Sequence, residues 1–351
     1  MNSPGLIAAI AIAAGVCACL GTRALIPLLR RAAVLDRPNE RSLHWAPTPR
    51  GGGIAVVAAV LAAWLATIVA GLAAPALLAA LGGAVLLAAM SWIDDLRSLS
   101  PATRLLGHVV AVGLGLVALA PAGPVLQGWL PDWLDRVAAA LLWIWFINLF
   151  NFMDGIDGMA GSEAAAIGLG LLLFAAIGAG RDPGLAALAA AIAAAALGFL
   201  VWNWAPARIF LGDVGSVPLG YLLGFLLLAA AARGAWKLAL ILPLYFLADA
   251  TITLLRRLVR GEPVWRPHLQ HFYQRAVQRG LGHAEIVWRV VAADLLLIGC
   301  GWAAENFWGV AGLGATAVVV AALLTSLAGL PGAGRQPIPA AKPRTEEAQH
   351  E

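Results

Sequence analysis

Charged residues are scarce in this chain. Only 12% of its 351 residues are Asp, Glu, Lys or Arg, about half of the roughly 25% that soluble domains carry. Hydrophobic residues make up 61%, and the mean hydropathy is +0.85. This composition excludes an ordinary soluble domain and predicts a membrane protein with several spans.

Cysteines and long polar stretches are also few. Cys17, Cys19 and Cys300 lie in apolar runs without the spacing of metal ligands, and we interpret them as small core residues. The longest polar stretch, 256–285, is too short for a separate soluble domain. No basic residue precedes the first apolar run, which predicts a first span and not a cleaved signal peptide.

Apolar runs that match the length of a membrane-spanning helix, about 20 residues, recur along the chain. We predict eleven spans, at 4–29, 52–71, 74–93, 105–121, 134–151, 159–179, 185–204, 214–232, 236–255, 286–303 and 307–330. The predicted fold class is an all-α, polytopic helical bundle. We expect residues 1–330 to form one transmembrane domain and residues 331–351 to form a disordered tail.

Basic residues predict the orientation of the bundle. Most of the 23 Lys and Arg residues lie in alternate loops, beginning with the loop after the first span, and in the tail. The positive-inside rule therefore places these loops and the C-terminus in the cytoplasm and the N-terminus outside. All the polar clusters described below fall on this cytoplasmic side, whereas a transporter would place polar groups near the midplane.

The most informative cluster runs from residue 148 to residue 158. Its polar members recur at every third position, which on a straight helix would carry them to opposite faces; they are Asn148, Asn151, Asp154 and Asp157. Gly155 and Gly158 allow the chain to leave the helix, so the four side chains can converge on a cation or a substrate. The alternative is a turn in which Asn and Asp serve as local caps.

Two adjacent carboxylates, Asp94 and Asp95, end the span at 74–93. The helix macrodipole disfavours each of them there by about 0.3–1 kcal/mol. Adjacent side chains point about 100° apart on a helix, so one can reach a metal while the other addresses a second group. The alternative is a solvated helix end that Arg97 and Arg104 neutralise.

Asp213 stands at the start of the span at 214–232. A helix N-terminus with nearby glycines suits a phosphate group, and Asp213 can hold the Mg²⁺ that bridges it. Phe210 offers a flat face on which a base can stack. The alternative is that Asp213 is an N-cap, which Ser216 completes.

The loop at 256–285 is rich in Arg and His. His268 and His271 can share one helical face and are predicted to bind a diphosphate beside Arg275 or Arg266. Zinc is the weaker reading, because a third ligand is lacking. The alternative is a basic loop that faces anionic lipid.

The first cytoplasmic loop can also meet phosphate, through Arg41, His44 and Arg50. Glycines 51–53 allow the backbone to approach a ligand or another helix closely. Polar residues within the spans must be paired or face the interior of the bundle. Of these, we expect Asp249 to turn toward the site together with Arg256.

These motifs, in this order, resemble the polyprenyl-phosphate N-acetylhexosamine-1-phosphate transferases. This family includes the phospho-N-acetylmuramoyl-pentapeptide transferase and the initiators of O-antigen synthesis. The resemblance extends over 36–285 and rests on the Asp-Asp pair, the 148–158 stretch, the 210–216 stretch and the late His motif. It implies a cytoplasmic site in the bacterial inner membrane, with Mg²⁺ or Mn²⁺ as the metal.

The resemblance also implies roles for the motif residues. Asp94 and Asp95 would act near the lipid phosphate, and Asp213 would bind Mg²⁺. The predicted catalytic residues are Asp94, Asp95, Asp157, His268 and His271, and the predicted substrate-binding residues are Asn148, Asn151, Asp154, Phe210, Arg41, His44, Arg104 and Arg275. Within these sets Asn151 and Asp154 would contact the nucleoside, Phe210 the uracil, and the two histidines the diphosphate or the sugar.

The implied reaction transfers an N-acetylhexosamine 1-phosphate from a UDP-sugar to undecaprenyl phosphate and releases UMP. The expected partners are a UDP-N-acetyl sugar, undecaprenyl phosphate and membrane lipids, with no nucleic acid, and small-residue faces permit a homodimer. The spaced histidines and the arginines at 97 and 104 look more like the O-antigen initiators than the peptidoglycan branch. The alternatives are a muramoyl-pentapeptide transferase, a lipid or sugar transporter and an intramembrane aspartyl protease that uses Asp213 and Asp249.

Overall fold

A computed structural model describes residues 3–38, 42–178, 181–264 and 268–329. The predicted disordered tail and Arg41 lie outside these residues, as does Arg266. The helices are α1 (Ser3–Arg31), α2 (Gly53–Val69), α3 (Leu77–Arg97), α4 (Pro101–Leu119), α5 (Asp132–Met153), α6 (Met159–Ile177), α7 (Pro183–Asn203), α8 (Asp213–Ala232), α9 (Trp236–Ile241), α10 (Leu244–Val259), α11 (Phe272–Gln278), α12 (His283–Ala303) and α13 (Ala311–Ala328). Short elements are β1 (Leu35–Asp36), β2 (Thr48–Pro49), the 3-10 helix Ala120–Ala122 and the π-helix Ala304–Trp308.

The predicted helical bundle is confirmed. Within the described residues, nine helices are long and apolar enough to cross a membrane, and α2 is a shorter apolar helix of 17 residues. The prediction of one continuous helix at 236–255 is wrong, because the chain breaks between α9 and α10 at Pro243. Proline lacks the backbone N–H that would continue the helix, and its ring clashes with the preceding turn. The orientation and the number of spans stay predictions.

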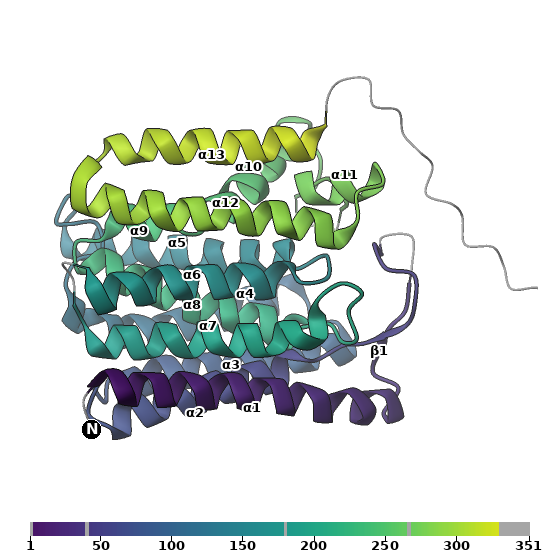
Figure 1. Cartoon of the computed structure of the whole chain (residues 1–351), viewed down its shortest axis with the longest axis horizontal. Helices are drawn as coiled ribbons and strands as arrows, with labels where there is room; N and C mark the ends of the chain where they lie inside the picture. Colours follow the sequence, from purple (N-terminus) through teal and green to yellow (C-terminus); the bar gives the residue numbers. More distant parts are fainter. Residues whose placement is uncertain (1–2, 39–41, 179–180, 265–267, 330–351) are drawn as a thin grey trace, which may run out of the picture.

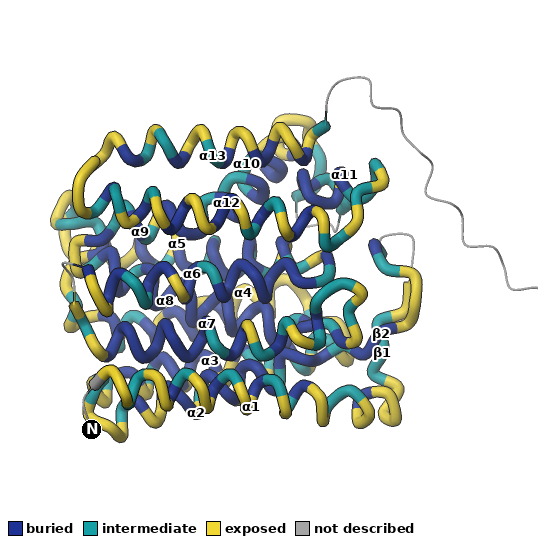
Figure 2. The backbone as a smooth tube through the Cα atoms, viewed as in Figure 1, coloured by how far each residue is buried: buried dark blue, intermediate teal, exposed yellow. Residues whose placement is uncertain are grey.

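Helix α8 is the centre of the bundle. Its most apolar window is 94% buried, against 22% for α1 and 33% for α13, and Figure 2 shows the same gradient from a buried middle to exposed outer helices. Small residues allow this crowding: a methyl group added at Gly220 would touch Ile147, and one at Gly224 would overlap Trp143. The N-terminus of α8 therefore lies in the middle of one end of the bundle.

The polar loops gather at that same end. In Figure 1 the β1–β2 segment, the α5–α6 turn, the α7–α8 loop and α11 all lie at the right-hand end, opposite the N-terminus. The sequence predicted this arrangement, since alternate loops of an up-and-down bundle share a side. What the tertiary structure adds is which of these loops touch one another.

The interior of the bundle also holds two buried acids from different helices. Glu163 of α6 is 0% exposed and Asp294 of α12 is 1% exposed. Within the described residues, none of their four oxygens receives a hydrogen bond from a donor group.

Candidate active site

A cavity of about 450 Å³ opens beside the N-terminus of α8. Four carboxylates line it, Asp36, Asp154, Asp157 and Asp213, together with His44 and His283. Arg50 is the one Lys or Arg among the described lining residues. The cavity therefore carries an excess of negative charge.

The first loop is anchored to the segment that precedes α8. The N–H of Phe210 donates to the carbonyl of Pro49 at 2.8 Å, and the N–H of Gly52 donates to the carbonyl of Phe210 at 2.9 Å. A methyl group added at Gly53 would overlap the backbone of Gly215, so α2 meets α8 at a contact that only glycine permits. The predicted close approach is confirmed, and it is made to another helix.

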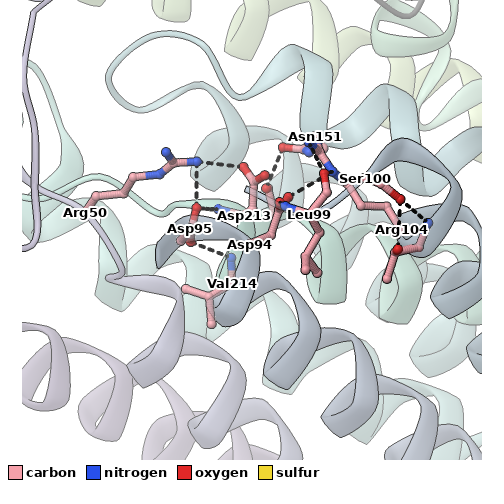
Figure 3. A network of polar contacts seen from close by, with 11 residues as sticks. Arg50, Asp94, Asp95, Leu99, Ser100, Arg104, Asn151, Asp213 and Val214 are labelled. Atoms are coloured by element: carbon pink, nitrogen blue, oxygen red, sulfur yellow. Dashed lines mark hydrogen bonds and ion pairs between the residues drawn. The ribbon is translucent and has the colours of Figure 1, made fainter. Parts of the chain in front are cut away.

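Arg50 joins the two acidic motifs, as Figure 3 shows. Its Nη2 lies 2.7 Å from Asp95 Oδ1 and 3.0 Å from Asp213 Oδ1. The side chain of Asp95 is 1% exposed, whereas that of Asp213 is 22% exposed. Two carboxylates far apart in sequence thus share one guanidinium at the rim of the cavity.

Asp95 caps helix α8. Its carboxylate accepts the N–H groups of Asp213 at 3.4 Å and Val214 at 3.2 Å. The alternative that Asp213 is the N-cap is wrong, because the cap residue is Gly212 and the capping side chain comes from α3. The first amides of α8 are occupied by Asp95 and do not form an open phosphate site, which corrects the sequence-based expectation.

Asp94 does not line the cavity and contacts other partners than its neighbour Asp95. Its Oδ2 lies 3.1 Å from Arg104 Nε, and its Oδ1 accepts the N–H of Leu99. The side chain of Asp94 is buried at 7% exposure. Asp94 and Asp95 therefore contact different partners, and the Asp94–Arg104 pair agrees with the alternative in which Arg104 neutralises the helix end. That one of the two carboxylates reaches a metal stays a prediction. The structure places both Asp94 and Arg104 in an ion pair outside the lining of the cavity.

The α5–α6 turn forms as predicted. Helix α5 ends at Met153, and Gly158 begins the next helix with a φ of +80°, a conformation that favours glycine. Asn151, Asp154 and Asp157 line the cavity, and the hydroxyl of Ser216 donates to Asn151 Oδ1 at 2.9 Å. The turn is thereby tied to the first turn of α8.

Asn148 does not join this group. Its amide nitrogen donates to the carbonyl of Ile144 at 2.7 Å and lies 3.3 Å from Nδ1 of His108, which is itself buried. The expectation that all four polar residues converge is therefore wrong for Asn148. Asn148 lies about one helical turn before Asn151 in α5, and its side chain contacts His108 of α4.

Asp154 has an unusual environment for a carboxylate. Burial, together with the negative charges of Asp213, Asp95 and Asp157, raises its pKa from 3.8 to about 7, although Arg50 opposes the shift. Near neutral pH Asp154 is therefore present in both its protonated and its ionised form. A cation bound close by would drive it to the ionised form.

The late histidines lie outside the lining of the cavity. His271 is 2% exposed, and its Nδ1 lies 3.1 Å from Asp249 Oδ1. Burial and the neighbouring His271 and Arg257 lower the pKa of His268 to about 4, so His268 is uncharged at neutral pH. Arg275 is exposed on α11 and does not line the cavity either. The structure does not bring the three residues to the cavity where they were expected to bind a diphosphate.

Asp249 and Arg256 turn toward α11 and not toward the cavity. Asp249 accepts the N–H groups of Phe272 at 3.0 Å and Tyr273 at 3.3 Å, and the guanidinium of Arg256 lies 5.0 Å from the centre of the Phe272 ring. Tyr273 links this cluster to the α5–α6 turn, because its hydroxyl donates to the carbonyl of Phe152 at 3.0 Å. We call Asp249, His271, Phe272 and Tyr273 the α10–α11 cluster.

Two titratable residues that line the cavity, Asp36 and His283, were not predicted as site residues from sequence. Arg50 was named only as one of three residues of the first loop that can meet phosphate. His283 Nδ1 lies 3.4 Å from Asp157 Oδ2, and the ring of His44 packs edge-on against Phe210 with centroids 4.8 Å apart. The glycine run that follows Arg50 was the one signal that its loop approaches another helix.

The cavity fits a magnesium ion in its donor chemistry. Within the described residues, no group of three or more His, Cys, Asp or Glu side chains is arranged to hold a metal. Mg²⁺, however, is commonly held by one or two carboxylates together with substrate phosphates. Among the described residues, the cavity is lined by four carboxylates and one guanidinium, so a bound cation would be electrostatically favoured there. Asp213, the carboxylate at the rim, is suitably placed to be a ligand.

Comparisons with known proteins assign the family. The chain is 30% identical over 320 residues to the decaprenyl-phosphate N-acetylglucosaminephosphotransferase of Mycobacterium tuberculosis, covering 80% of this chain and 78% of the relative. The family model for glycosyl transferase family 4 matches residues 77–231. The chain belongs to glycosyl transferase family 4. The resemblance inferred from the motifs is thereby confirmed.

Two further transferases match at similar levels. The probable undecaprenyl-phosphate N-acetylglucosaminyl 1-phosphate transferase of Bacillus subtilis is 29% identical over 278 residues, which cover 74% of this chain and 75% of the relative. A phospho-N-acetylmuramoyl-pentapeptide-transferase of Mycolicibacterium paratuberculosis is 31% identical over 358 residues, covering 87% and 97%. The relatives therefore include both polyprenyl-phosphate N-acetylglucosamine phosphate transferases and a phospho-N-acetylmuramoyl-pentapeptide transferase.

Proposed function

We propose that this protein transfers an N-acetylhexosamine 1-phosphate from a UDP-sugar to a polyprenyl phosphate, with Mg²⁺, at the bacterial inner membrane. The observation that carries the proposal is the carboxylate-rich cavity at the N-terminus of α8, with Arg50 at its rim. Two relatives are named for N-acetylglucosamine phosphate transfer to undecaprenyl and decaprenyl phosphates. The product would start an O-antigen or a related envelope glycan.

The chemistry is one phosphoryl transfer. An oxygen of the lipid phosphate forms a bond to the β-phosphorus of the UDP-sugar, while the bond from that phosphorus to the bridging oxygen breaks. UMP leaves with the electron pair, and the sugar 1-phosphate remains on the lipid as a diphosphate. When bound, Mg²⁺ offsets the negative charge on the diphosphate oxygens.

The residues of the chain supply position and charge, which dominate catalysis of phosphoryl transfer. Asp213 would hold the cation, and Asn151 and Asp154 line the same cavity. Phe210 and His44 also line an adjoining cavity of about 630 Å³, which includes Trp45 and Pro206. We place the uracil in this more apolar cavity and the diphosphate near Arg50.

The lipid tail has a candidate surface on α10. Leu255, Leu258 and Val259 are exposed there at 54%, 61% and 87%, and a shallow groove pairs this apolar face with Arg256 and Arg260. Exposed apolar side chains next to arginines suit a lipid with an anionic head group. The break at Pro243 gives α10 a direction that a single straight helix would not have.

The test is release of UMP by the purified protein in detergent with undecaprenyl phosphate, Mg²⁺ and a panel of UDP-N-acetyl sugars. We expect UMP and a lipid-linked product with UDP-N-acetylglucosamine, and none when the lipid or the metal is withheld. Absence of UMP with every UDP-N-acetylhexosamine would falsify the proposal. Product from UDP-N-acetylmuramoyl-pentapeptide alone would favour the second candidate, which the 97% coverage of that relative supports.

A further inference from the structure

Arg50 occupies the place where a cation would lie between the two acidic motifs. One nitrogen atom, Nη2, contacts Asp95 Oδ1 at 2.7 Å and Asp213 Oδ1 at 3.0 Å. Charge-assisted contacts of this length are strong. The two carboxylates are thus already neutralised in part by a group that belongs to the protein.

The two contacts differ in how easily they can be released. Asp95 keeps two further hydrogen bonds, from the N–H groups of Asp213 and Val214, when Arg50 moves. For the carboxylate of Asp213, Arg50 is the one partner found among the described residues. Movement of Arg50 would therefore leave Asp95 in place and free Asp213.

The backbone of Arg50 is fixed, but its side chain has room to move. The N–H of Arg50 donates to the carbonyl of Val34, and the N–H groups of the two glycines that follow donate to the carbonyl of Phe210. The side chain is 33% exposed and borders the 450 Å³ cavity. A long arginine side chain on a fixed backbone can turn from one anion to another without any change of the fold.

We propose that Arg50 is a resident counter-ion that holds Asp213 and Asp95 when no metal is bound, and that it moves from Asp213 to the diphosphate when a divalent cation and a nucleotide-sugar bind together. This inference rests on the proposed function. Arg50 then weakens the binding of a metal ion that is added without nucleotide. It strengthens the binding of a metal ion that is added together with a diphosphate. It serves as a positioning residue for Asp213 and as a binding residue for the substrate.

The experiment measures metal binding directly, by titrating the purified protein in detergent with Mn²⁺ and following free Mn²⁺ by electron paramagnetic resonance. Without nucleotide, Arg50→Gln is expected to bind Mn²⁺ about tenfold more tightly than wild type, because a competing positive charge is removed. Arg50→Lys should lie between the two. Adding UDP-N-acetylglucosamine should tighten Mn²⁺ binding in wild type by about the same factor, by reciprocal linkage, and much less in Arg50→Gln.

The control is Arg97→Gln, which removes the same charge from an exposed position at the end of α3 and should bind Mn²⁺ like wild type. Equal Mn²⁺ affinities in wild type and Arg50→Gln overturn the inference. Absence of Mn²⁺ binding in both proteins, with UMP release intact, also overturns it while the transferase activity stands. The expected pattern of affinities without UMP release from any UDP-sugar would support the role of Arg50 and count against the proposed activity.

Discussion

Two buried aspartates in this protein cap a neighbouring helix, and they do so in opposite settings. Asp95 of α3 caps α8 and pairs with Arg50, while Asp249 of α10 caps α11 and pairs with His271. Arg50 is 33% exposed and reaches a second carboxylate at the cavity, whereas His271 is 2% exposed. The Asp95 network is therefore open to a ligand, and the α10–α11 cluster is closed on itself.

The difference between the two networks shows that the location of a capping aspartate in the bundle decides whether its neighbours can bind a ligand. Each aspartate satisfies orphan amides at a helix N-terminus, which would otherwise be costly in an apolar bundle. At α8 one carboxylate more is available than the cap requires, namely Asp213, and it faces the cavity. At α11 the donors around Asp249 are protein groups. The first network is suited to chemistry and the second to stability.

The largest expected effect is a loss of turnover on substitution of Asp213, without a loss of stability. Asp213→Asn should lower turnover by about a thousandfold, a loss typical of removing a key electrostatic group from an active site. Its unfolding temperature and its elution in size-exclusion chromatography should match wild type, since Asp95 and not Asp213 caps α8. The measurements are UMP release and thermal unfolding in detergent. Turnover near wild type in a folded Asp213→Asn protein would remove Asp213 from the site.

The next largest effect is a loss of stability on substitution in the α10–α11 cluster. Asp249→Ala should lower the free energy of unfolding by about 3 kcal/mol, because a buried charged hydrogen-bond network is broken. Thr253→Val is the matched control, since it removes a single 3.3 Å contact to the same carboxylate and should cost less than about 1 kcal/mol. Denaturant titration of both proteins checks the difference. Equal losses would show that Asp249 does not organise α11.

The kcat/KM of the transferase should depend on pH through Asp154, which lines the cavity. Burial and the carboxylates around it raise the pKa of Asp154 to about 7, so Asp154 is protonated below this pH and charged above it. If the charged form supports metal and substrate binding, kcat/KM should fall by about tenfold per pH unit below 7 and level off above. Raising the Mg²⁺ concentration should move the midpoint to lower pH, because the cation competes with the proton.

The matching control for this prediction is Asp154→Asn, in which the descent below pH 7 should be absent from whatever activity remains. The midpoint is found by measuring UMP release from pH 5 to 9 at two Mg²⁺ concentrations. A midpoint that does not respond to Mg²⁺ would show that Asp154 and the cation are not coupled.

The smallest expected effect concerns Arg275. It is exposed on α11 and does not line the cavity, so Arg275→Gln should change kcat/KM by less than about twofold, as is usual for a screened surface charge. The KM for the UDP-sugar is the sensitive readout. A tenfold rise in KM would mean that α11 approaches the substrate, and the contrast between an open and a closed network would no longer hold.

Composition and motif spacing determined much of this protein. Scarcity of charge and recurring apolar runs predicted the helical bundle, the glycines at 155 and 158 predicted the end of α5, and the motifs predicted the family. These features depend on local sequence, since the length of an apolar run and the freedom of a glycine act within a few residues. The resemblance also supplied the residues that a site could contain.

The tertiary structure decided which of those residues meet. The sequence could not show that Asp95 would cap α8, that Arg50 would join Asp95 to Asp213, or that His271 would face Asp249, because each pairing depends on how distant helices pack. Likewise, Asn148 and Asn151 are three residues apart and similar in kind, but only Asn151 lines the cavity. The sequence determined which polar groups the bundle must accommodate, and the packing around α8 decided which of them a ligand can reach.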